Sequence, residues 1–111
     1  MIPSGAVVIV HLANPVEQHW GVLEELGPAG VVFRGINVAS FEDFLAQATR
    51  NEEHILGFST MFVPMFRVER IFLDQTVGAV ESYQRRFLER TGSTLEAYLG
   101  TAIVSDDTPP S

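Results

Sequence analysis

The hydrophobic pattern of residues 58–74 predicts a pair of β-strands joined at a sharp corner. Met61, Phe62 and Val63 suit the pleated, half-buried surface of a strand. Pro64 cannot donate to a strand ladder, so it marks a strand end, and the extended pattern resumes at residue 69. Seventeen residues exceed the length of a typical strand, about 5–6 residues, which favours two strands and a tight turn over 64–67. A helix has similar apolar content, but Pro64 and the β-branched residues of the segment argue against it.

Three more strands are predicted upstream of this pair. Residues 6–12 are apolar on both faces, which indicates a central buried strand. Residues 18–26 read as a second strand, in which Gly21 indicates a bulge or bend. The turn residues 27–30 separate it from residues 31–36, so these two segments are predicted to form a hairpin.

An amphipathic helix is predicted between the third and fourth strands, over residues 41–51. Phe41, Phe44, Leu45 and Ala48 recur at helical spacing and form one apolar stripe. Ser40 stands where a capping residue is expected. We expect this helix to cover one open end of a small barrel.

The C-terminal third of the chain has a helical period. A second helix is predicted over residues 78–91, with Gly92 at its left-handed C-terminal position. A capping box at residues 93–96 starts a short third helix that Gly100 ends. We expect residues 1–75 to form the barrel, 76–100 a helical extension and 101–111 a disordered tail. At 111 residues and 46% hydrophobic content, one domain with one core is expected.

The order of the strands, the bend at Gly21 and the turn at 64–67 resemble SH3-like small barrels, and among them the Sm-like proteins. The resemblance covers about residues 5–74 and implies a mainly β, five-stranded small barrel with an inserted helix. Sm-like proteins form rings by pairing strand four of one subunit with strand five of the next. This implies a homo-oligomer that makes contact through residues 61–64 and 68–73.

The chain departs from the Sm-like pattern at the turn between strands four and five. Sm-like proteins often carry an Arg-Gly pair there, which helps to bind RNA. Here the turn has Phe66-Arg67, and Arg34-Gly35 lies before the inserted helix. The usual N-terminal helix is missing. An RNA-binding alternative would use Arg34, Phe66 and Arg67.

The charge of the chain disfavours a polyanionic partner. Seven Arg and no Lys face fourteen acidic residues, a net charge of −7, whereas nucleic-acid binding usually needs a basic footprint. Arg34, Arg67 and Arg70 could form a small anion site. We expect them instead to pair with neighbouring carboxylates, for which Glu17, Glu69 and Asp74 are the candidates.

The apolar run around the corner is the main candidate for a contact surface, since Met and Phe are adaptable anchors. The alternative is ordinary core, with alternate side chains inward. The oligomer-interface candidates are Met61, Phe62, Val63, Met65, Phe66, Ile71 and Phe72.

No catalytic motif is present, so we expect a non-enzymatic interaction module without cofactor or metal. His11, His19 and His54 show no ligand spacing, there is no Cys, and Glu24 and Glu25 should point to opposite faces of a strand. A small enzyme whose site is assembled in space is the remaining alternative. Without a signal peptide or a long apolar run, a cytoplasmic location is expected.

Overall fold

The computed structural model describes residues 2–50 and 57–100. Its strands are β1 (Val7–Leu12), β2 (Glu17–Gly27), β3 (Gly30–Asn37), β4 (Ser59–Pro64) and β5 (Val68–Leu73). Its helices are α1 (Phe41–Arg50), α2 (Tyr83–Thr91) and α3 (Leu95–Leu99), with short 3-10 turns η1 (Val38–Ser40) and η2 (Met65–Arg67). The predicted end of the first helix at residue 51, His54 and the predicted tail lie outside the described residues.

The five strands form one antiparallel sheet in the order β4-β3-β2-β1-β5. The fold is therefore mainly β, as predicted, and the β2–β3 hairpin is confirmed. The two strands and the corner of residues 58–74 are also confirmed.

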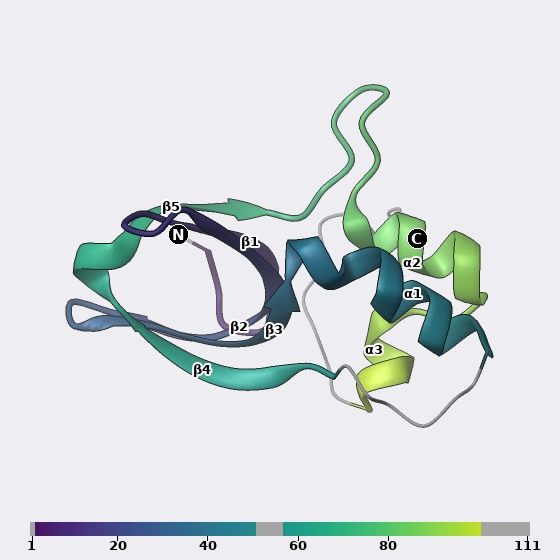
Figure 1. Cartoon of the computed structure of the whole chain (residues 1–111), viewed down its shortest axis with the longest axis horizontal. Helices are drawn as coiled ribbons and strands as arrows, with labels where there is room; N and C mark the ends of the chain where they lie inside the picture. The colour runs from purple at the N-terminus through teal and green to yellow at the C-terminus, as the bar shows by residue number, and fades with distance from the viewer. Residues whose placement is uncertain (1, 51–56, 101–111) are drawn as a thin grey trace.

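The two strands do not pair with each other within the chain. β4 pairs with β3 and β5 pairs with β1, so η2 carries the chain from one edge of the sheet to the other (Figure 1). The β1–β2–β3 meander has a free edge on each side, and each later strand takes one of them. The sheet is not closed into a barrel by a β4–β5 ladder.

The two faces of the sheet bury different side chains. Val7, Trp20 and Ile36 pack with residues of the helices, such as Phe44 and Phe87. The opposite face builds a second cluster of buried residues: Ala6, Val8, Val10, Leu12, Leu23, Val31, Phe33 and Val63. Because β4 and β5 both contribute side chains to this second cluster, the sheet curves around it (Figure 1).

Gly21 allows β2 and β3 to approach closely. It pairs with Gly35, and a Cβ at Gly21 would lie 2.2 Å from the Arg34 carbonyl oxygen. A bulge or a bend was expected at Gly21; the bulge lies instead between Leu23 and Glu25, where the register with β3 shifts. Gly21 is required because β2 and β3 leave no room for a side chain there. The additional residue of the bulge lies further along β2.

The first helical segment begins earlier than predicted. The 3-10 turn η1 precedes α1, and its N-cap is Asn37, whose side-chain oxygen accepts from the Ala39 backbone N–H at 2.8 Å. Ser40 is therefore the last residue of η1 and not the cap of a new helix. The apolar stripe is confirmed, with Phe41, Phe44 and Leu45 buried.

The second helix begins later than predicted, because Ser82 is its N-cap and accepts from the Arg85 backbone N–H. Gly78, the predicted start, has a φ of +59°, which a right-handed helix does not admit. The third helix is capped by Thr94, one residue after the predicted position. Gly92 and Gly100 adopt the predicted left-handed conformation.

Replacing Gly21 by Ala should destabilise the fold by about 2 kcal/mol, because the new methyl group meets backbone of β3 that cannot give way. Chemical denaturation measures the change in the free energy of unfolding. Gly27→Ala is the matched control, since a Cβ there meets nothing within 4 Å. Equal stability of the two variants would contradict the close approach of β2 and β3.

Candidate functional site

The helices and the strand turns lie at opposite ends of the sheet (Figure 1). At the end with the turns, η2 is bonded to both neighbouring connections: the Met65 N–H donates to the Ala29 carbonyl, and Arg67 reaches the β1–β2 turn. At the other end, α1, α2 and α3 pack around the buried cluster that contains Trp20, Phe44 and Phe87. Each end carries a candidate site.

Asp74, directly after β5, joins the sheet to the helices. Its carboxylate is buried and accepts from the Trp20 indole N–H and from the backbone N–H groups of Tyr83 and Gln84, each at 2.9 Å. The Asp74 backbone N–H donates to the Val7 carbonyl. A buried carboxylate at the first turn of α2 also complements the helix dipole. This residue therefore has a structural role that its sequence position after a strand did not reveal.

Three exposed phenylalanines lie on the corner and on the sheet edges. Phe66 on η2 is 85% exposed, Phe62 on β4 57% and Phe72 on β5 42%. Met61, Met65 and Ile71 are half-buried, while Val63 is 6% exposed and belongs to the core. Of the predicted contact residues, the exposed ones are therefore Phe62, Phe66 and Phe72, on β4, η2 and β5.

Arg67 holds the β1–β2 turn against η2. Its guanidinium donates to the Ala13 and Pro15 carbonyls and to Glu17 Oε2, the last at 3.0 Å. This hydrogen bond holds the pKa of the Glu17 carboxyl below its ordinary value, with a smaller effect from His19. The stability that the pair contributes is present at neutral pH and is lost as the pH falls through the folded-state pKa.

The proposed anion site of three arginines is not assembled. Arg67 is engaged as above, Arg70 pairs with Glu69 at 2.8 Å, and Arg34 lies on β3 opposite Thr60 of β4. The expectation that these arginines pair with nearby carboxylates is confirmed for two of them, as Arg67 pairs with Glu17 and Arg70 with Glu69. Phe66 and Arg67 are neighbours on η2, as the RNA-binding alternative requires, but the Arg67 guanidinium is directed at the turn.

The histidines of the described segments have local partners. His19 is buried, with Nε2 at 3.3 Å from Glu17 Oε1 and its ring against Phe33. The His11 ring meets the Phe72 ring edge-on, with the centroids 4.9 Å apart. Across residues 2–50 and 57–100, no group of three or more His, Asp or Glu side chains is placed to hold a metal ion. Within the same ranges, no helix has the length and apolar character to cross a membrane.

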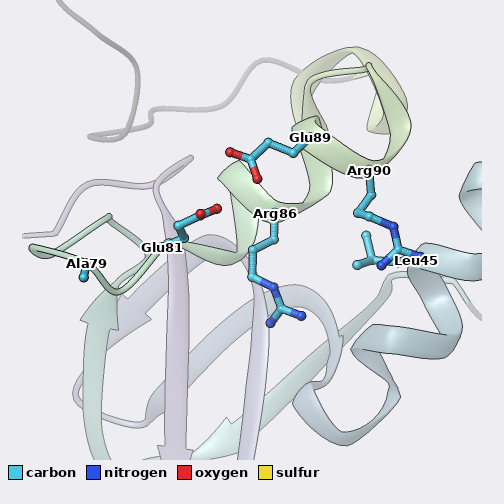
Figure 2. Close-up of a pocket in the computed structure, with 6 residues that line it drawn as sticks. All are labelled: Leu45, Ala79, Glu81, Arg86, Glu89 and Arg90. Atoms are coloured by element: carbon cyan, nitrogen blue, oxygen red, sulfur yellow. The ribbon is translucent and has the colours of Figure 1, made fainter.

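A pocket of about 410 Å³ opens between α2, α1 and the loop before α2 (Figure 2). The lining residues are Leu45, Ala79, Glu81, Arg86, Glu89 and Arg90. This pocket cannot be recognised from the sequence pattern, because its residues come from three separate segments. The spacing of Arg86 and Arg90, which places both on one helix face, was the signal available.

The chain was compared with family models, with curated proteins and with solved structures, and none of the three comparisons found a match.

Replacing Asp74 by Ala should cost about 3–5 kcal/mol of stability, because it leaves the Trp20 indole and the first N–H groups of α2 without their acceptor. Asp74→Asn, which keeps one oxygen, should cost less. Chemical denaturation followed by the fluorescence of Trp20, the single tryptophan, measures both. The control is Glu69→Ala on the exposed surface of β5, which should stay within about 0.5 kcal/mol of the parent. If Asp74→Ala lost no more stability than Glu69→Ala, the contacts of Asp74 with Trp20 and α2 would not hold the sheet and the helices together.

Proposed function

We propose that this chain is a self-associating interaction module in which β4 of one copy joins β5 of the next. The observation that carries the proposal is the strand order, which places β4 and β5 at the two opposite edges of one sheet. Because β4 forms one edge and β5 forms the other, the two edges of each copy are different. Contacts between unlike edges are heterologous, and they generate a ring where the rotation closes.

The edges are suited to strand addition. An edge strand presents unpaired backbone N–H and C=O groups, and another strand can complete them. In the part of the chain that the structure describes, no strand pairs with the outer side of β4 or of β5. Each edge also carries an exposed aromatic side chain, Phe62 on β4 and Phe72 on β5. Cross-strand aromatic pairs add about 0.2–1 kcal/mol each to a sheet.

The corner between the edges supports the same proposal. Phe66 is the most exposed large apolar side chain of the described residues. Arg67 fixes the turn beside it through the Ala13 and Pro15 carbonyls. A rigid exposed aromatic side chain loses little conformational entropy on binding, which is why such residues act as anchors. The small-barrel description, with β4 and β5 left as open edges, and the Sm-like family belong to this proposal, since the curved sheet and its strand order are compatible with both.

Phe62→Glu should convert the oligomer to a monomer of 12.3 kDa. The charge would stand on the proposed contact and would have to be desolvated there. Size-exclusion chromatography with light scattering measures the mass, and thermal unfolding should stay close to that of the parent because Phe62 is exposed. In the same peak, the ratio of the absorbance at the nucleic-acid wavelength to that at the protein wavelength reports retained RNA. RNA binding would weaken steeply as the salt concentration rises.

Leu88→Glu is the matched control, because Leu88 is also exposed but lies on α2, away from both edges. It should leave the oligomer intact. A monomeric parent protein, or dissociation by Leu88→Glu and not by Phe62→Glu, would contradict the proposal. An oligomer that retains RNA until the salt is raised would favour the RNA-binding alternative.

A further inference from the structure

The β4 edge can accept a strand from another protein as well as from a second copy of this chain. β4 lies along one edge of the sheet, and its inner side pairs with β3 (Figure 1). Within residues 2–50 and 57–100, no strand pairs with its outer side. An extended peptide can add to such an edge through main-chain hydrogen bonds, and its alternate side chains then set the specificity. The side chains beside the free edge therefore indicate which peptide fits.

Thr60 and Phe62 of β4 share a face of the sheet with Arg34 and Val32 of β3. Arg34 lies opposite Thr60, and Val32 lies opposite Phe62. Because residues two apart on a strand share a face, this is also the face of Ile36, which packs with the helices. Thr60 and Phe62 are exposed, whereas Arg34 and Val32 are half-buried. The free edge thus has apolar surface at Phe62 and, two residues away, an arginine next to the strand.

The Arg34 guanidinium has no acceptor in the described part of the chain. Of the arginines there, it alone makes neither a hydrogen bond nor an ion pair. In the same ranges, Glu24 and Glu25 on the neighbouring β2 form no ion pair with it. A guanidinium has five N–H donors, in a fork that matches a carboxylate. Neighbouring strands lie about 4.8 Å apart, and an extended arginine side chain is longer, so Arg34 can pass the short Thr60 and reach an added strand.

We propose that the β4 edge binds an extended acidic segment of a partner protein, with an apolar side chain opposite Phe62 and a carboxylate opposite Thr60 that pairs with Arg34. In an antiparallel strand, this carboxylate follows the apolar residue by two positions. β5 of a second copy has the same spacing in Phe72 and Asp74, but the Asp74 carboxylate is buried and accepts from its own chain. A segment with a free carboxylate satisfies Arg34, which a second copy does not.

Three peptides test the proposal by isothermal titration calorimetry on the full chain: acetyl-KTFTETK-amide, acetyl-KTFTQTK-amide and acetyl-KTFETTK-amide. The second has Gln in place of Glu, and in the third the same Glu is moved to the opposite face of the strand. The first should bind saturably and at least about tenfold more tightly than the others, because only it brings a carboxylate to Arg34. The net charge of −7 on the chain favours the more cationic Gln peptide, so overall charge does not produce this preference. Equal affinities, or no saturable binding of the first peptide, overturn the proposal.

Variants assign the preference to Arg34. Arg34→Gln should weaken the Glu peptide about tenfold and leave the Gln peptide unchanged, so that the two bind alike. Thr60→Glu, which brings a carboxylate of the chain itself to Arg34, should also remove the preference. Arg70→Gln on β5 is the matched control and should change neither affinity, and thermal unfolding checks that each variant is folded. A preference for Glu that survives both Arg34→Gln and Thr60→Glu overturns the proposal.

The mass of the parent chain, measured by light scattering with and without saturating KTFTETK peptide, separates this proposal from self-association. An oligomer that the peptide dissociates supports both, because the peptide and a second copy use the same edge. A monomer that binds the peptide supports peptide binding and contradicts self-association. An oligomer whose mass the peptide leaves unchanged keeps β4 for a second copy and overturns the peptide proposal.

Discussion

The buried carboxylate of Asp74 is the contact on which the arrangement of the whole chain depends. A carboxylate removed from water is costly unless donors surround it. Here the donors come from the Trp20 side chain on β2 and from the first turn of α2. Asp74 can therefore be buried only when the sheet and the helix are both in place. This requirement couples the end of the last strand to the start of the C-terminal helices.

Trp20 extends that coupling into the core. Its ring packs edge-on against the ring of Phe41 on α1, with the ring centroids 5.2 Å apart. The ring of Phe58, before β4, lies at the same centroid distance. Phe87 of α2 and Leu95 of α3 belong to the same buried cluster. The C-terminal helices thus share a core with the sheet and complete it. With this end of the sheet covered, the exposed phenylalanines Phe62, Phe66 and Phe72 lie on the edge strands and at the corner.

The periodicity of the sequence was enough to predict the elements but not how they connect in space. Pro64 and the apolar runs on either side of it located β4, η2 and β5 correctly. Nothing local to those residues says that β5 crosses to β1, because that depends on which edges of the meander are free. The errors at the helix starts are local: Asn37 accepts from the N–H two residues later and Ser82 from the N–H three residues later, as N-caps commonly do, but the apolar spacing had placed the two starts at Ser40 and Gly78.

Candidate residues that lie close together in the sequence were predicted, and those that come from distant segments were not. Exposed Phe62 and Phe66 were found from a contiguous apolar run, and Phe72 from the strand-five contact that the Sm-like resemblance implies. Val63, which is buried, was included because the run did not show which of its side chains face the core. Charge alone suggested that the arginines pair with nearby carboxylates, but it did not say that Arg67 would take Glu17. The pocket and the role of Asp74 were missed, because each brings together residues from distant segments.

Cross-linking of two single-cysteine chains tests whether β4 of one copy joins β5 of the next, as we propose. The chain has no cysteine of its own, so Phe62→Cys and Phe72→Cys each carry one thiol. A short bis-maleimide, which tolerates a small offset in register, is added to each variant alone and to their mixture. If β4 joins β5, a cross-linked dimer forms in the mixture and little forms in either variant alone. Efficient cross-linking of Phe62→Cys by itself, or none in the mixture, would contradict it.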